Sequence, residues 1–435
     1  MKKLAVFLGL VSAQAFAIDG VNSGSSLTTG PSSNHFSMAS AIHNPAMAPL
    51  VVPEDERWRI NYLPSISLAT EVGDVENFAD DLDELVDLLE EPAADLEDPS
   101  ATLDRFNDVL VRMGEEGYLK QSVNISVPIT PAYYHSKGAA GTVFVDLNIG
   151  AQASIQVIDS ELSIDEQNLG YATDTSLYVK SGIENKLSIG YGREVFSDHK
   201  WVKGKAKLFA GVKLNIIQLE LSKQVTRLDD LDGQEVSDVL KDEYDKNLKS
   251  NTGIGIDVGV VWDADWYRVG LHIDNLNSPE FSYGDIGVNC DDLDVGTIER
   301  NSCEVTRVFI ADGRLRSSEK HTKHAITRVD GLLHLTDRWV VSSALDLATY
   351  DDIVGYENQW LNLATTYTPK TTLIPATRVG YQLNMAGTEL AAYTFGFTFF
   401  KSVSLDFEWG TESVEVDGDS APRRFGFSLA FEESF

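Results

Sequence analysis

The chain has 435 residues, 43% of them hydrophobic, and its 35 Lys and Arg against 67 Asp and Glu give a formal net charge of −32. A surface this negative repels phosphate backbones, which excludes direct nucleic-acid binding from the expected activities. After the N-terminus, no stretch approaches the ~20 uninterrupted apolar residues of a membrane-spanning helix. A β-barrel stays compatible with this mild composition, because only alternate strand residues face lipid.

Residues 1–17 have the basic start, the short apolar run and the A-x-A cleavage site of a secretory signal peptide. These parts are Lys2 and Lys3, then Leu4 to Val11, then Ala15-Phe16-Ala17. Cleavage after Ala17 makes Ile18 the expected first residue of the mature chain. Export places the chain in an oxidising compartment. The following residues, 18–57, are rich in Ser, Gly and Asn and show little periodicity.

From residue 58 onward, apolar residues return at every second position. In 142–157 the odd-numbered residues are apolar, and the even-numbered ones are small or polar except Phe144. Only an extended strand separates two such sets onto opposite faces. The recurring pattern predicts about fourteen antiparallel strands. They lie near 58–68, 121–130, 142–158, 175–191, 202–221, 253–263, 266–274, 324–336, 338–347, 358–367, 376–384, 391–399, 402–410 and 424–435.

A soluble β-sandwich also alternates, so the second face of the strands has to separate the two fold classes. In a sandwich that face meets water and is usually rich in charge and Thr. Here it is rich in Gly, Ser, Ala and Gln with scattered charges, as expected of a crowded barrel interior. We therefore favour a membrane barrel over a sandwich.

Two acidic stretches within residues 74–116 follow a helical period instead. Apolar residues recur at steps of three and four in 74–91 and again in 101–114, and Pro92 ends the first stretch. The pattern predicts an acidic helical hairpin in the first outer loop. It serves either as a lid or partner surface, or as an element packed over the barrel mouth, which we favour. The acid excess of the outer loops keeps them solvated, or alternatively binds divalent cations.

The connections between predicted strands alternate between long and short. Most long ones fall on one side of the barrel, including 69–120, 222–252 and 275–323, while tight turns such as 263–265 and 400–401 fall on the other. Outer-membrane barrels have this asymmetry. The tryptophans fall near predicted strand ends, where indoles form interfacial girdles. The predicted girdle consists of Trp58, Trp201, Trp262, Trp266, Trp339, Trp360 and Trp409.

Four lysines lie on one face of the predicted strand 202–221. They are Lys203, Lys205, Lys207 and Lys213. They form either a cationic track for an anionic solute or one half of a set of ion pairs inside the barrel. We favour pairing, because acids fall on the same face of other strands. Candidate partners are Asp146, Glu184, Asp257, Asp406 and Glu408.

Cys290 and Cys303, the two cysteines of the chain, lie in the long loop 275–323. An even count in an exported protein predicts one disulfide, since a metal site needs more soft ligands and a redox site needs C-x-x-C. No His stands in a metal-binding spacing, and no G-x-S-x-G elbow occurs. We therefore predict no catalytic residue, no cofactor and no metal site, and the chain is not expected to be an enzyme.

The last predicted strand alternates aromatic and small residues up to the C-terminus. Its apolar positions are Phe425, Phe427, Leu429, Phe431 and Phe435. A strand of this kind with a terminal Phe, in a chain with a leader, is typical of the segment read by the barrel-assembly machinery.

The sequence also resembles a known family. The segment around Asn44-Pro45-Ala46, which follows a run of small residues, resembles the "NPA" segment near the N-terminus of FadL-like outer-membrane proteins. More closely, the order of features resembles the conjugal-transfer TraF family within that superfamily. Besides the early strand and the hairpin, the features are Arg268-Val269-Gly270-Leu271, Asp274 to Phe281, Leu345-Asp346-Leu347, Arg378-Val379-Gly380-Tyr381 and Asn384 to Thr388.

The resemblance implies one fourteen-stranded barrel, 58–435, whose lumen is plugged by residues 18–57. It implies a non-enzymatic outer-membrane protein associated with plasmid conjugative transfer. The alternative is a FadL-like diffusion channel for hydrophobic compounds. The expected partners are outer-membrane lipid, the barrel-assembly machinery, and either conjugation proteins of the envelope or a hydrophobic solute. An apolar tunnel opening beside a kinked strand favours the channel, and a filled polar lumen favours the conjugation role.

Overall fold

The computed structural model describes residues 22, 24–34, 37–52, 59, 65–90, 99–127, 133–134, 141–165, 170–198, 206–230, 246–416 and 418–431. Within these residues, fourteen strands form one antiparallel sheet that closes on itself through the pairing of β2 with β4. Their bounds are β1 Ser65–Val72, β2 Tyr118–Val127, β4 Thr142–Ile158, β7 Ser176–Asp198, β8 Ala206–Arg227, β9 Lys249–Asp263, β10 Tyr267–Asp274, β13 Ile326–Thr336, β14 Trp339–Asp346, β17 Trp360–Tyr367, β18 Ala376–Asn384, β19 Ala391–Phe399, β20 Val403–Gly410 and β23 Arg424–Phe431. The predicted barrel of about fourteen strands is confirmed.

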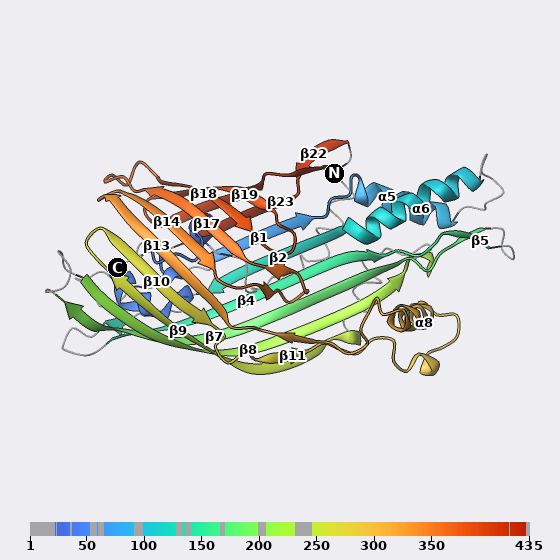
Figure 1. The fold of residues 1–435 in the computed structure, drawn as a ribbon, viewed down its shortest axis with the longest axis horizontal. Coiled ribbons are helices and arrows are strands. Elements are labelled where there is room, and N and C mark those ends of the chain that lie inside the picture. Colours follow the sequence, from blue (N-terminus) through green and yellow to red (C-terminus); the bar gives the residue numbers. More distant parts are fainter. Residues whose placement is uncertain are drawn as a thin grey trace.

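The barrel wall is uneven in height (Figure 1). Strands β4, β7, β8 and β9 have 15 to 23 residues, whereas most of the others have 8 to 11. The short two-residue strand β3, Tyr133–Tyr134, pairs with β4 beside the closure. On one side, the long strands therefore rise well beyond the rest of the wall.

The two faces of the wall differ in chemistry at every strand. On β20, Phe407 and Trp409 point outward and are 37% and 54% exposed, while Asp406 and Glu408, which alternate with them, are fully buried inside. The same alternation runs along β4, where Val143 is 43% exposed and Asp146 is buried. An apolar outer band around a polar interior is the arrangement that a hydrocarbon environment requires.

Phe144, the exception in the pattern of β4, points inward and packs against Met47 and Phe209. It meets the N-terminal segment rather than lipid, which explains why a large aromatic residue stands among the polar ones.

The two ends of the barrel are unlike, as Figure 1 shows. At one end, here called the turn end, β9 and β10, β13 and β14, and β19 and β20 are joined by two or three residues. The other, the loop end, carries the helices α5 Phe78–Glu90, α6 Pro99–Glu116 and α8 Ile298–Ala311. It also carries the short hairpins β5 Ser163–Asp165 with β6 Gly170–Ala172, β11 Glu280–Ser282 with β12 Lys320–Thr322, β15 Tyr350–Asp351 with β16 Glu357–Asn358, and β21 Ser413–Val416 with β22 Asp419–Pro422.

Helices α5 and α6 pack on the outer face of the tall wall. Their apolar residues, including Leu85 and Met113, form one cluster with Ile155, Val157 and Leu177. These wall residues continue the outward-facing rows of β4 and β7. The expected packing over the barrel mouth is therefore wrong in its position, because the tall wall offers an apolar outer face above the rest of the barrel.

Helix α8, which was not predicted, packs on the inner face of the same wall. Val305 and Phe309 contact Tyr178 of β7 and Val225 of β8. The predicted disulfide between Cys290 and Cys303 is present, with the Cα atoms 5.6 Å apart, and ties α8 to the preceding turn. Thr297 begins the helix by accepting a hydrogen bond from the backbone N–H of Arg300.

Residues of the N-terminal segment lie inside the barrel, where Figure 1 shows them as short blue helices near the turn end. The helices are α2 Ser26–Thr29, α3 Ala39–His43, η1 Pro45–Met47 and α4 Ala48–Val51. Most of their residues are buried. Within the described ranges, no helix is both long and apolar enough to cross a membrane.

The tryptophan girdle needs one correction. Trp266, Trp339 and Trp409 are exposed on the outer face near strand ends, whereas Trp360 is 9% exposed. Trp360 starts the inward row of β17 that continues with Asn362, so its indole belongs to the lumen. Trp58, Trp201, the signal peptide with Ala15, Ala17 and Ile18, and Phe435 lie outside the described residues.

Candidate functional site: the lumen and its polar cavity

The NPA segment is seated on a row of glycines that crosses three neighbouring strands. Gly192 of β7 pairs with Gly211 of β8, and Gly211 pairs with Gly259 of β9. A Cβ at any of these positions would collide with Asn44 or Pro45. The glycines thus leave room for the backbone turn to lie directly against the wall.

Asn44 holds this turn together and also ties it to the wall. Its side-chain oxygen accepts a hydrogen bond from the backbone N–H of Ala46 at 3.1 Å, which starts η1. Its amide nitrogen donates to the carbonyl of Val260 at 3.3 Å. Sequence reasoning found this segment by resemblance alone, and the glycine row supplies the physical reason for it.

The rest of the segment is hydrogen-bonded to strands around much of the barrel. Thr28 donates to Asp406 of β20 at 2.5 Å, and the backbone N–H of Ser33 donates to Asp330 of β13 at 2.7 Å. Other such bonds join Gly24 to Ser428, Ser33 to Arg268, Leu27 to Gln382 and Ile42 to Lys213. These bonds satisfy polar groups that would otherwise be buried without partners.

Many charged residues of the lumen form ion pairs, whereas Asp146, another predicted partner, accepts a hydrogen bond from Ser126 at 3.2 Å. The pairs include Lys213–Asp257 at 2.9 Å, Arg378–Asp406 at 2.9 Å, Arg424–Glu71 at 2.7 Å, Arg424–Glu408 at 2.5 Å, Arg328–Asp274 at 3.3 Å and Lys186–Glu184 at 3.3 Å. The favoured interpretation of Lys213 as one half of an ion pair is confirmed. Lys207 lies near the turn end, 42% exposed and 3.6 Å from Glu194, while Lys203 and Lys205 lie outside the described residues.

Residues 350–358, here called the strap, close the lumen from the loop end. Ile353 and Val354 pack against inward-facing Leu219 and Leu221 of β8 and against Tyr283. The adjacent Asp352 accepts a hydrogen bond from Gln152 at 3.0 Å and lies 3.6 Å from Lys120. This strap was not predicted, because its residues show no strong periodicity in the sequence.

Tyr356 anchors the far side of the strap. Its hydroxyl accepts a hydrogen bond from Gln156 at 2.7 Å and lies 3.0 Å from the hydroxyl of Ser154. The ammonium group of Lys120 lies 4.6 Å from the centre of its ring. Burial raises the pKa of Tyr356 to about 12.

The loop that bears α8 is held at the rim by Glu319. This carboxylate lies 2.6 Å from Lys180 of β7 and 3.6 Å from Lys223 of β8. Burial alone would raise the pKa of Glu319, but the two lysines more than offset burial and lower the pKa below its ordinary value.

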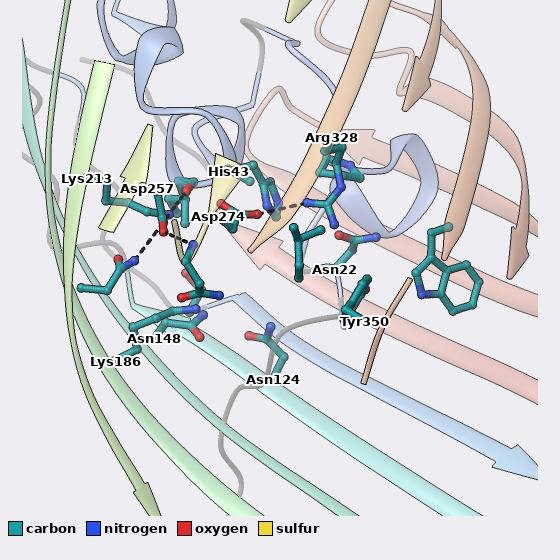
Figure 2. Close-up of a pocket in the computed structure, with 18 of the residues that line it drawn as sticks. Asn22, His43, Asn124, Asn148, Lys186, Lys213, Asp257, Asp274, Arg328 and Tyr350 are labelled. Atoms are coloured by element: carbon teal, nitrogen blue, oxygen red, sulfur yellow. Dashed lines mark hydrogen bonds and ion pairs between the residues drawn. The ribbon is translucent and has the colours of Figure 1, made fainter. Parts of the chain in front are cut away.

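Between the N-terminal segment and the strap lies a cavity of about 100 Å³ (Figure 2). Residues from both sides of the barrel line it, and Figure 2 shows Arg328 and Tyr350 facing Asn148 and Lys186 across it. Its lining is mostly polar, with six asparagines: Asn22, Asn124, Asn148, Asn215, Asn275 and Asn362. Among the described residues, no group of His, Cys, Asp and Glu has the arrangement of a metal site.

The wall ladder gives no sign of a lateral opening in the described strands. Neighbouring strands stay paired around the circumference, and register shifts occur at Glu194/Phe196 and His334/Thr336, both near the turn end. The lumen thus combines a seated segment, paired charges and a polar cavity, which suits polar contents better than hydrocarbon.

Three solved structures similar to the chain are a FadL homologue and two monoaromatic hydrocarbon channels. A Pseudomonas aeruginosa FadL homologue has 13% identity, with 97% of this chain and 100% of that chain covered and a TM-score of 0.39. A mutant of the TodX monoaromatic hydrocarbon channel has 10% identity, coverage of 92% and 95%, and a TM-score of 0.43. The CymD monoaromatic hydrocarbon channel has 13% identity, coverage of 96% and 99%, and a TM-score of 0.41.

A comparison with curated proteins finds no match. Residues 41–346, more than half of the chain, match the protein family described as "F plasmid transfer operon, TraF, protein". The matched range begins just before the NPA turn and runs through the end of β14. On this match, and in agreement with the order of motifs in its sequence, the chain belongs to the TraF family of plasmid transfer operons.

Proposed function

We propose that the protein is a non-enzymatic outer-membrane barrel that serves plasmid conjugative transfer through its loop end. In this proposal the leader directs export, the terminal strand is read by the barrel-assembly machinery, and the loop end faces the outside. The partners are envelope or surface proteins of the conjugation apparatus rather than DNA, which the net charge of −32 repels.

The filled lumen is the observation that carries the proposal. The described residues within 24–34 and 37–52 include several that are hydrogen-bonded to the wall, and the strap 350–358 packs across the loop end. A channel for hydrophobic compounds needs an apolar passage, whereas this cavity is lined by amides and ion pairs. A hydrocarbon would bind weakly to such a lining, because the free energy lost in desolvating the polar groups exceeds the free energy gained from apolar contact.

The loop end offers the contact surface. Helices α5 and α6 flank the tall wall outside, and α8 with its disulfide covers the inner face. Elements held this firmly are preorganised, so binding a partner there loses little conformational entropy. We infer that this end, rather than the lumen, is the working surface in conjugation.

The alternative function is FadL-like diffusion of a hydrophobic compound. It requires the N-terminal segment to leave its glycine seat and the wall to open sideways.

Two measurements on one deletion strain separate the two functions. The strain carries the conjugative plasmid without this gene. It is complemented with the wild-type protein or with a variant that lacks helices α5 and α6, called the hairpin variant. Mating frequency and uptake of toluene are measured in parallel, with barrel folding checked by heat-modifiable gel mobility.

We expect mating to fall in the deletion strain, to return with wild-type protein and to stay low with the hairpin variant, while toluene uptake is unchanged. Loss of toluene uptake with normal mating would establish the channel instead. If neither measurement changed, both functions would be rejected.

A further inference from the structure

We propose that the central cavity of the lumen binds a small, neutral, polyhydroxylated molecule with the bulk of one monosaccharide ring. The inference rests on the lining of the cavity and does not depend on the conjugation role.

The size of the cavity sets the scale of the ligand. Its volume is about 100 Å³. On this measure one water needs ~10–15 Å³, so the cavity holds roughly seven to ten waters. One sugar ring with its hydroxyl groups replaces a water cluster of that size. Ile42 and His43 of the seated N-terminal segment bound the cavity on one side, and Tyr350 at the base of the strap bounds it on the other.

The charges around the cavity indicate a neutral ligand. Lys213 lies 2.9 Å from Asp257, Lys186 lies 3.3 Å from Glu184, and Arg328 lies 3.3 Å from Asp274 and is also paired with Asp346. Each cation already has an acid beside it. An anionic or cationic ligand would have to break one of these buried pairs, which is costly.

Two buried polar atoms offer hydrogen bonds that nothing in the described chain takes up. The indole N–H of Trp360 is one, and the side-chain oxygen of Asn362 is the other. Their residues are 9% and 2% exposed, both line the cavity, and they stand on the same inward row of β17. One atom donates and the other accepts, and a hydroxyl group does both.

The remaining lining suits the mixed surface of a sugar. Asparagines, Ser126 and Tyr350 supply further donors and acceptors, while Ile42 and Ile326 supply apolar contact for C–H groups. The guanidinium of Arg424 lies 4.5 Å from the centre of the Trp360 ring and helps to hold it in place. Polar edges with small apolar patches are typical of sites that fix the orientation of a polar ligand.

Titration calorimetry on the full-length mature protein in detergent tests the proposal. The probes are D-glucose, its trisaccharide maltotriose, and toluene. The variants are Trp360→Phe, which keeps the ring and removes the N–H, and Asn362→Leu, which removes the acceptor. Trp409→Phe, on the outer face, is the matched control. Heat-modifiable mobility verifies folding of each protein.

We expect D-glucose to bind the wild type, with affinity about tenfold weaker in each lumen variant and unchanged in Trp409→Phe, since one lost hydrogen bond to a buried partner is of that order. Binding of maltotriose as well would identify the end of a glycan, rather than a free sugar, as the source of the ring. Absence of glucose binding to the wild type would overturn the proposal without any variant. Glucose binding by both lumen variants with the affinity of the wild type would also overturn the proposal, as would binding of toluene without binding of glucose.

Discussion

The inner and outer faces of the barrel wall come from alternate residues of the same strands, yet different forces hold them. On β20 the outward Phe407 and Trp409 pack against Phe427 and Phe425 of β23 with their rings inclined to one another, and these contacts need only apolar surroundings. The inward Glu408 depends on a specific partner, Arg424. An outer residue is therefore replaceable by any apolar residue, whereas an inner residue is fixed by its neighbours.

The largest effect is expected from removing one buried cation. Arg424→Ala leaves Glu71 and Glu408 without their shared partner inside the wall. Loss of one member of a buried pair costs ~3–5 kcal/mol. Urea unfolding of the protein in liposomes measures this loss.

The neighbouring Arg423→Ala is the matched control. Arg423 pairs with Asp74 and Glu412, both more than half exposed at 62% and 52%. Screening by water reduces such pairs to about 1 kcal/mol or less. Equal effects of the two substitutions would contradict the distinction between ion pairs buried in the lumen and ion pairs exposed to water.

The next effect concerns the lipid-facing side. Leu363 is 45% exposed near the middle of β17. Leu363→Arg should lower the free energy of unfolding in liposomes by ~2–4 kcal/mol, because a charge is then held in hydrocarbon. Leu363→Val is the control and should cost well under half as much. A tolerated arginine at this position would mean that the face meets water.

A smaller and more local effect is expected at the glycine row. Gly211→Ala drives a methyl group into the backbone of Pro45, while Gly331→Ala makes only ordinary contact at 3.5 Å with Ser343. Overpacking of this kind costs ~1–3 kcal/mol. Hydrogen exchange of residues 37–52 should quicken in the Gly211 variant alone. Unchanged protection would show that the NPA turn does not rest on this row.

The smallest effect is a pH dependence at the loop end. The folded-state pKa of Glu319 lies below its ordinary value of 4.5. Its stabilising contribution is therefore present above pH 4.5 and is lost as the pH falls through the folded-state pKa. Hydrogen exchange in α8 should quicken at low pH in the wild type, and Glu319→Gln should remove this dependence. A pH response that persists in Glu319→Gln would place the titrating group elsewhere.

Much of the wall was predictable from one rule, because contact with lipid requires an apolar residue at every second position of a strand. The strands, the outward Trp339 and Trp409, and the inward Asp257 follow from that rule alone. Phe144 and Trp360 break it for a reason that no local pattern carries, namely contact with segments distant in sequence.

The interior was harder to predict than the wall. Neither the residues of the strap 350–358 nor those that line the cavity follow a periodic pattern in the sequence, because both features form where loops meet the tall wall. Helix α8 has an amphipathic face that a search for helical spacing in the loop 275–323 would have found. The sequence predicted that Lys213 would pair with an acidic residue, but it could not identify Asp257 as that residue. The balance of charges indicates that partners exist and does not show which residues lie side by side.

Quenching of tryptophan fluorescence by brominated acyl chains tests the central claim most directly. Two single-tryptophan proteins are reconstituted, one keeping Trp409 on the outer face and the other keeping Trp360 in the lumen, with the other tryptophans changed to Phe. The two-faced wall predicts strong quenching of Trp409 and almost none of Trp360. Equal quenching of both, or none of either in a protein that stays in solution, would contradict it.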